Sequence, residues 1–432
     1  MATTASSVSS SDPRRQFAVS VVETLRDAGF EALWAGGCVR DQLLGKSPKD
    51  YDVASTATPD EVIRIFGTRR TVPVGASFGV VMVLGPTKSA GQIEVATFRS
   101  DGEYLDGRRP NSVQFCRPEE DARRRDFTIN GLFFDPIRNE VIDYVGGRDD
   151  LAAGVVRAIG EPVDRFREDK LRMLRAVRFA STFRFHLDLQ TADAIRRFAT
   201  QLDQVSVERI AQELRRMLAH STRATAVKML EETSLLAEVL PEITSISGIL
   251  QQDETLVALG LLESASFEAA LSLLLRPLYV SAEREHRQRV ARVEGVCRRL
   301  KMSNEETDCV CWLINSLPVL ENISAQPLHI LKLLLNHPHS QLLLDVSAAL
   351  ARSCGREPVD AEFCRRYLSR SSPEILAPAA LIDGRDVMGL GIPAGPVVRE
   401  LLAIVRNEQL DELLATREQA MDRLRELYRS AR

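Results

Sequence analysis

The sequence predicts an α+β protein, with a small mixed-sheet head followed by an all-helical neck, body and tail. Two observations favour this class. From Phe17 to about Ile159, strand-like and helical segments alternate, and each strand candidate is flanked by Gly, Pro or Ser. From Asp164 onward, apolar residues recur at helical spacing almost without interruption. Because 432 residues exceed the usual size of a single core, we expect several domains.

The expected elements of the head follow one another between glycine and proline residues. Residues 16–28 are amphipathic and predict a helix that Gly29 ends as its C-cap. Residues 30–35 predict a strand, which leads through Gly36–Gly37 into a short helix that ends at Leu44. Three further strands are expected at residues 51–54, 79–84 and 92–98.

The helical part divides into segments that proline residues separate. Ser206 is placed to cap an amphipathic helix over residues 207–218. Later helices are expected to break near Pro241, Pro277, Pro318 and Pro338. We therefore expect four parts, namely a disordered arm (1–15), the head (16–159), a neck (160–222), and a body with a tail (223–432).

Composition restricts the location and the partners of the protein. No apolar run approaches the roughly 20 residues that span a bilayer, and residues 1–11 lack the regions of a signal peptide. Seven cysteines without a framework spacing indicate free thiols, so we expect a cytoplasmic protein with no membrane partner. The net charge of −4 does not exclude nucleic acid, because arginines crowd locally, above all from Arg165 to Arg178.

A glycine pair opens the candidate site. Gly36 and Gly37 lie between a strand and a helix, where the backbone can approach a phosphate and unpaired N–H groups are available. Arg40 adds a fork of donors that suits phosphate oxygens. A plain tight turn would also contain two glycines, so this motif depends on the residues that follow it.

Two carboxylates follow the glycine pair. Asp50 and Asp52 are two residues apart, so on a strand their side chains point the same way. Adjacent carboxylates repel unless a cation lies between them, and hard oxygen ligands select Mg²⁺. We expect Asp50 and Asp52 to hold Mg²⁺ and to be catalytic, with Glu94 as the third carboxylate of a two-metal site. The alternative for Glu94 is a surface residue on an edge strand.

Five motifs, in order between about residues 30 and 218, resemble those of class II tRNA nucleotidyltransferases and bacterial poly(A) polymerases. They are residues 36–45 with 50–52, residues 124–130, residues 143–148, residues 168–172 with Arg175 and Arg178, and residues 208–210 with 213–214. Residues 383–388 and 391–396 also resemble a segment of these enzymes. The resemblance implies a nucleotidyltransferase head, a neck that recognises the nucleotide base, and a body and tail that bind RNA.

The resemblance also implies which residues bind the nucleotide. The ribose and phosphates would be held by Gly36, Gly37, Arg40, Arg125, Asp126 and Asn130. Asp169 and Arg172 would choose the base, because Asp accepts and Arg donates hydrogen bonds at its edge. Arg175 and Arg178 would face the base or the triphosphate, and the last motif would brace the helix. Asp169, Arg172, Arg175 and Arg178 are three residues apart, so they lie on one stripe of a helix. A solvated basic face would show the same spacing.

The implied reaction is template-independent transfer of CMP and AMP from CTP and ATP to the 3′ end of tRNA, with release of pyrophosphate. Residues 74–80 and the polar loop 101–110 resemble enzymes that act on tRNA and add the terminal A. The alternatives are a poly(A) polymerase, an enzyme that adds A alone, and a non-catalytic RNA-binding protein, which would be expected to lose Asp50, Asp52 or Arg125. The implied partners are tRNA, CTP and ATP, with Mg²⁺ as cofactor, and the chain is expected as a monomer or a homodimer.

Two residues depart from the family's pattern. Cys38 stands where a small residue is usual, and Gly131 replaces the Ala expected after Asn130. Neither change removes a functional side chain. We expect Cys38 to be a small packed residue rather than a reactive thiol.

Overall fold

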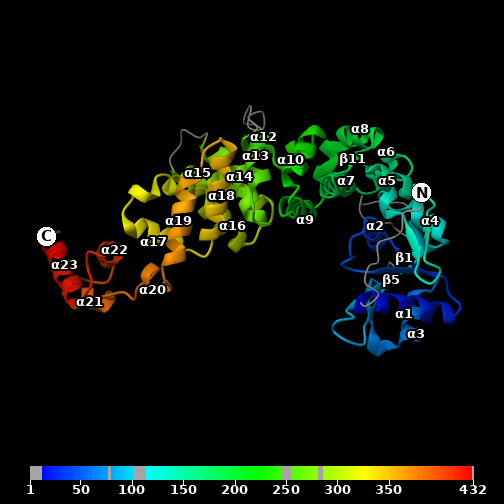
Figure 1. Cartoon of the computed structure of the whole chain (residues 1–432), viewed down its shortest axis with the longest axis horizontal. Coiled ribbons are helices and arrows are strands. Elements are labelled where there is room, and N and C mark those ends of the chain that lie inside the picture. The colour runs from blue at the N-terminus through cyan, green and yellow to red at the C-terminus, as the bar shows by residue number, and fades with distance from the viewer. Residues whose placement is uncertain (1–11, 76–78, 102–112, 245–253, 281–285, 431–432) are drawn as a thin grey trace. The chain divides into compact units, whose positions relative to one another are not determined.

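The computed structural model describes residues 12–75, 79–101, 113–244, 254–280 and 286–430, and the chain divides into two compact units. One unit comprises Met1–Met217 and Thr225–Val239, and the other comprises Leu218–Ala224 and Leu240–Arg432. The strands that the structure describes all belong to the first unit, and the described elements of the second are helical (Figure 1). A mixed sheet followed by helices confirms the predicted α+β class.

The head is built on a seven-stranded sheet. In sheet order its strands are β3 (Thr71–Gly75), β4 (Val80–Leu84), β5 (Gln92–Thr97), β2 (Asp52–Ser55), β1 (Ala32–Ala35), β8 (Phe133–Asp135) and β9 (Glu140–Ile142). The pair of β2 and β5 is parallel, and the other neighbouring pairs are antiparallel. This order places β2 and β5 side by side in the interior of the sheet.

Short helices and one hairpin complete the head. The helices are α1 (Pro13–Asp27), α2 (Gly37–Leu43), α3 (Pro59–Phe66), α4 (Pro118–Arg123) and α5 (Gly147–Ala153), and the hairpin pairs β6 (Arg99–Asp101) with β7 (Val113–Phe115). The predicted disordered arm was wrong for residues 13–15, which belong to α1. Asp12 caps this helix by accepting a hydrogen bond from the N–H of Arg14, and Pro13 suits the first helical position. Residues 1–11 lie outside the described residues.

The remaining elements that lie wholly or mostly in the first unit follow the head. They are β10 (Val155–Val156), α6 (Pro162–Glu168), α7 (Leu171–Phe183), β11 (His186–Leu187), α8 (Leu189–Phe198), α9 (Val207–Leu218), α10 (Arg223–Glu232) and α11 (Leu235–Val239). Asp169 was expected on one helical stripe with Arg172, Arg175 and Arg178, and this was wrong for Asp169, which lies between α6 and α7. The Asp169 backbone is extended, and its carboxylate accepts the N–H of Leu171 at 3.0 Å. An Asp that binds the backbone in this way starts a new helix instead of continuing the old one.

The second unit consists of helices α12 (Pro241–Thr244), α13 (Glu254–Leu261), α14 (Phe267–Val280), α15 (His286–Arg299), α16 (Asn304–Leu320), α17 (Leu328–Leu335), α18 (Ser340–Ser353), α19 (Val359–Arg370), α20 (Pro373–Leu376), α21 (Gly384–Met388), α22 (Pro396–Leu410) and α23 (Arg417–Ser430). Helices were expected to break near Pro277 and Pro318, and α14 and α16 do end close to them, at Val280 and Leu320, although both prolines lie inside their helices. The two helices pack against each other along buried apolar side chains, and this packing offsets the hydrogen bond that each proline lacks.

The last three helices enclose a small core of their own. Its buried residues are Ile382, Val387, Ile392, Leu401, Val405, Ala420 and Leu424. Within the part of the chain that the structure describes, none of the helices has the length and apolar character needed to cross a membrane.

Candidate active site

One cavity in the first unit collects most of the predicted site residues. It has a volume of about 560 Å³ and is lined by Gly36, Gly37, Arg40, Asp52, Arg124, Arg125, Asp126, Asn130, Asp169, Leu171, Arg172, Arg175, Arg178, Phe179 and Arg209. Eleven of the thirteen predicted residues are among them, and the two that are not are Asp50 and Glu94. Seven arginines against three aspartates give the lining a positive charge, which suits a polyanionic ligand.

The turn at the start of α2 requires glycine. Gly36 has a φ of +70°, in the left-handed region that residues with a side chain rarely adopt. A Cβ atom at this position would also lie 2.9 Å from Nη1 of Arg125. The absent side chain therefore lets Arg125 approach the backbone of the turn.

The departures at Gly131 and Cys38 both have a packing explanation. A Cβ atom on Gly131 would lie 2.7 Å from Cγ2 of Val145, so an Ala would not fit here without movement of that neighbour. Cys38 is buried and donates its thiol to the carbonyl of Ala35 at 3.3 Å. Its burial confirms the expected packed residue and raises the pKa of Cys38 to about 12, which disfavours the thiolate.

Of the three predicted catalytic carboxylates, Asp52 lines this cavity and Asp50 and Glu94 lie outside its lining. Because β2 begins at Asp52, Asp50 precedes the strand and lines a second cavity beside the start of α1. Glu94 lies directly across from Asp52 in the parallel register of β2 and β5, on the same side of the sheet. The alternative for Glu94 was wrong about the edge strand, since β5 lies in the interior of the sheet, but right that Glu94 is an exposed residue. Among the residues described, no group of three His, Cys, Asp or Glu side chains could hold a metal ion, so this role stays a prediction.

The negative charge of Asp52 is poorly compensated. Its side chain opens on the cavity, but the surrounding protein limits its hydration, and this desolvation is the largest reason that the pKa of Asp52 is raised to about 6. The charges of Glu94 and Asp50 raise this pKa further, whereas Arg125 lowers it. Neighbouring carboxylates repel one another when ionised, and a divalent cation bound between them relieves this repulsion.

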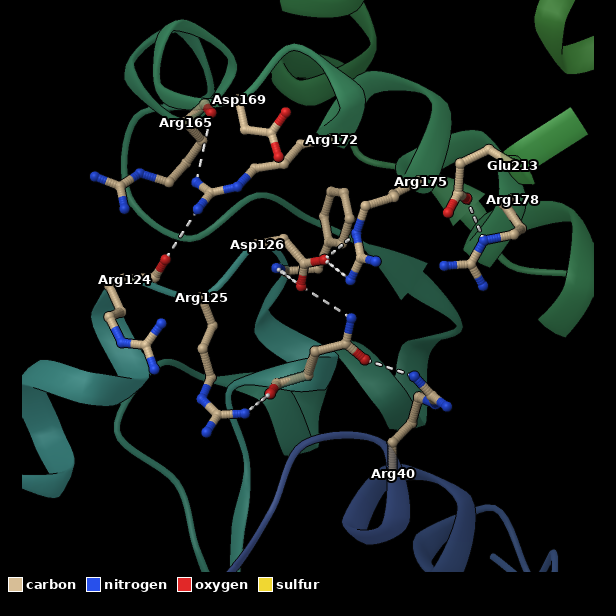
Figure 2. Close-up of polar contacts among 12 residues, drawn as sticks. Arg40, Arg124, Arg125, Asp126, Arg165, Asp169, Arg172, Arg175, Arg178 and Glu213 are labelled. Atoms are coloured by element: carbon tan, nitrogen blue, oxygen red, sulfur yellow. Dashed lines mark hydrogen bonds and ion pairs between the residues drawn. The ribbon is translucent and has the colours of Figure 1, made fainter. Parts of the chain in front are cut away.

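A chain of hydrogen bonds crosses the cavity from α7 to α2 (Figure 2). Arg175 donates two hydrogen bonds, of 2.9 and 2.6 Å, to Oδ2 of Asp126. Oδ1 of Asp126 accepts from Asn130 at 3.0 Å, and the amide oxygen of Asn130 accepts from Arg40 at 2.6 Å. Burial by itself would raise the pKa of Asp126, but Arg175 and Asn130 lower it to about 2. Asp126 therefore stays ionised and fixes the donors on both sides of it.

The residues predicted to choose the base are held by neighbouring elements. Asp169 accepts two hydrogen bonds from Arg209 of α9, at 3.1 and 2.7 Å. Arg172 donates to the carboxylate of Glu168 at 2.6 Å. Arg178 forms an ion pair with Glu213, also of α9 (Figure 2). The two contacts from α9 match the bracing role that the last motif implies.

Four lining residues were not predicted as part of the site, namely Arg124, Leu171, Phe179 and Arg209. The ring of Phe179 lies under three guanidinium groups, with ring-centre distances of 4.1 Å to Arg178, 5.2 Å to Arg40 and 5.3 Å to Arg175. The spacing of four residues from Arg175 to Phe179 is the signal in the sequence that could have found it. The polar loop at residues 102–112 and residues 76–78 of the strand–turn motif lie outside the described residues.

Comparison with known proteins agrees with this geometry. The family model described as "Poly A polymerase head domain" matches residues 32–157, and "Probable RNA and SrmB- binding site of polymerase A" matches residues 184–247. The CCA-adding enzyme of Geobacillus kaustophilus (strain HTA426) is 34% identical over 412 residues, which cover 93% of this chain and 95% of the relative. The CCA-adding enzyme of Bacillus subtilis (strain 168) is 42% identical over 223 residues, or 51% of this chain and 55% of the relative.

The solved structures point the same way. The crystal structure of the Bacillus stearothermophilus CCA-adding enzyme in complex with CTP superposes with a TM-score of 0.77 at 30% identity, over 97% of this chain and 98% of that chain. The sheet, the glycine turn and the electropositive cavity, together with these relatives, define a nucleotidyltransferase. Within that class, the chain belongs to the family of the CCA-adding enzymes.

Proposed function

We propose that this protein adds CMP and AMP, from CTP and ATP, to the 3′ end of tRNA, and so completes or repairs the CCA end. The observation that carries the proposal is the cavity that opens at Asp52 and is lined by seven arginines. A relative of 30% identity has been solved with CTP, and relatives over nearly the whole chain are CCA-adding enzymes. The reaction transfers a nucleotide to the RNA 3′-hydroxyl and releases pyrophosphate.

The triphosphate is held at the end of the cavity that the glycine turn forms. Arg125 is oriented by two hydrogen bonds to Asp121, of 3.1 and 2.9 Å, and its Nη1 lies beside Gly36. This arrangement leaves guanidinium donors and the backbone at the start of α2 for phosphate oxygens. Because Asp121 is buried and fixes Arg125 in advance, little side-chain entropy is lost when the triphosphate binds.

The base is selected at the end of the cavity that α7 and α9 form. Each carboxylate oxygen of Asp169 has a second lone pair beside the one that Arg209 occupies, so it can still accept a hydrogen bond. Cytosine and adenine both carry an exocyclic amino group, whereas uracil and guanine carry a carbonyl oxygen at the corresponding position. An acceptor at Asp169, with donors at Arg172, therefore favours CTP and ATP over UTP and GTP.

The carboxylates of the sheet fit a magnesium ion. Asp52 has a raised pKa beside Glu94 and Asp50, so a divalent cation would relieve a repulsion that the protein does not neutralise. Asp50 and Asp52 would hold Mg²⁺, with Glu94 beside them. A bound Mg²⁺ would supply charge neutralisation at the α-phosphate and acidification of the attacking hydroxyl.

The remaining helices bind the RNA in this proposal. The body and tail hold the acceptor stem and T arm, mainly through phosphates, so affinity falls as salt rises. In this proposal the chain is divided into head, neck, body and tail. It acts in the cytoplasm, where the tRNA pool is, as a monomer or a homodimer.

Replacement of Asp52 tests the proposed chemistry. In Asp52→Ala we expect incorporation of labelled CMP into tRNA to fall by about a thousandfold, because a metal-holding carboxylate is lost. Circular dichroism and unfolding temperature are expected to be unchanged. Asp27→Ala, an exposed carboxylate at the end of α1, is the matched control and keeps full activity. Turnover close to that of the control would contradict the role of Asp52.

A further inference from the structure

Phe183 lies outside the lining of the nucleotide cavity, at the last position of α7, yet its ring contacts residues that shape the cavity. It stacks on Phe179, with ring centres 6.1 Å apart and planes inclined by 7°. The guanidinium carbon of Arg40 is 4.5 Å from the ring centre of Phe183 and 5.2 Å from that of Phe179. The ammonium of Lys46 is 4.9 Å from the ring centre of Phe183.

Each of the three guanidinium nitrogens of Arg40 donates a hydrogen bond. Its Nε and Nη2 donate to Asp41 at 2.9 and 2.7 Å, and its Nη1 donates to Asn130 at 2.6 Å. The residue is only 8% exposed, so its charge is largely removed from water. A desolvated guanidinium gains more from an aromatic ring than an exposed one does. Hydrogen bonds therefore fix the edges of Arg40, and two phenylalanine rings of α7 contact the group as well.

We infer that Phe183 and Phe179 form an aromatic clamp on Arg40, and that this clamp holds the glycine turn of α2 in register with α7. The turn forms the triphosphate end of the cavity, and α7 carries Arg172 and Arg175 at the base end. Phe183 is thus a positioning residue for the nucleotide, although it does not touch the cavity. This inference rests on the proposed function.

The clamp predicts a specific kinetic change. In Phe183→Leu we expect the KM for CTP and for ATP to rise about tenfold, the effect of losing a desolvated cation–π contact. The KM for tRNA and kcat are expected to stay within about twofold, since this contact orients the nucleotide rather than the RNA. Phe183→Tyr keeps an aromatic ring and should restore the KM values. The dissociation constant of CTP, measured by calorimetry without RNA, should rise in parallel.

Two comparisons separate the clamp from ordinary packing. Phe198 of α8 also lies near two guanidinium groups, those of Arg167 and Arg197, at 5.9 Å each. Neither arginine lines the cavity, so Phe198→Leu should leave the KM values unchanged. In an Arg40→Ala background, Phe183→Leu should add little, because effects that pass through one residue are not additive. Full additivity, or normal CTP binding by Phe183→Leu, would overturn the clamp. If the wild type binds CTP but adds no nucleotide to tRNA, the proposed function is refuted and not the clamp. The CTP affinities of wild type and Phe183→Leu would still test the clamp in that case.

Discussion

The buried carboxylate of Asp126 allows the most quantitative prediction. Its pKa is lowered from 3.8 to about 2, despite its burial, by Arg175 and Asn130. Each pKa unit corresponds to about 1.4 kcal/mol, so the ionised group contributes roughly 2.5 kcal/mol to the free energy of unfolding at pH 7. Asp126→Asn keeps the shape of the side chain but removes its charge. We therefore expect the variant to be less stable at pH 7 by about 2 kcal/mol.

The pH dependence of this difference has a definite sign. A carboxylate whose pKa is lower in the folded state stabilises above its unfolded pKa of 3.8, and this contribution is lost as the pH falls toward about 2. The difference between wild type and Asp126→Asn should therefore be constant from pH 7 to 5. At pH 3, about half of it should remain.

The assay uses the two tryptophans of the chain, one in each compact unit. In a Trp312→Phe background, the fluorescence of Trp34 reports unfolding of the first unit alone during urea titration. Asp193→Asn is the matched control, because Asp193 and Arg196 form an exposed ion pair that is worth less than about 1 kcal/mol. A stability difference for Asp126→Asn no larger than that of the control, or one that grows as the pH falls, would refute the role of the buried network.

Two further predictions concern the cavity. The pKa of Asp52 is raised to about 6, so protons should compete with Mg²⁺ below that pH. We expect the affinity for Mg²⁺, measured by calorimetry, to fall about tenfold per pH unit there. Glu94→Gln should move this decline to lower pH, because the charge of Glu94 raises the pKa of Asp52. A decline that Glu94→Gln leaves in place would contradict the coupling of the two carboxylates. Asp169→Ala should reduce the preference for CTP and ATP over UTP and GTP by about ten- to a hundredfold, while tRNA affinity in a filter-binding assay stays unchanged. Intact nucleotide preference would exclude base selection by Asp169.

Local motifs predicted much of the site because their chemistry lies close together in the sequence. The turn at Gly36 is an example, since a left-handed backbone followed by a helix is specified by a few neighbouring residues. The strand at Asp52 was also predicted, within one residue of its observed start. Asp50 precedes both the expected strand and β2, and it lines another cavity. The two carboxylates still interact, since the charge of Asp50 raises the pKa of Asp52.

Contacts between distant residues were beyond the reach of sequence patterns. Asp126 was expected to hold the nucleotide, and it lines the cavity, but the sequence did not reveal that its oxygens bind Arg175, 49 residues away, and Asn130. Asp169 was expected within a helix, but it starts α7 and is bound by Arg209, 40 residues away. Such pairs depend on how the helices pack, because an arginine's spacing along its own helix does not reveal which carboxylate lies opposite.

The most direct test of the proposed function is the sequence of the product. The purified protein is incubated with Mg²⁺, CTP and ATP and a tRNA transcript that ends at the discriminator base, and the 3′ ends are then sequenced. Addition of the three nucleotides C, C and A, with no further extension, is the predicted result. A long run of A, addition of A alone, or addition of CC without A would each contradict it.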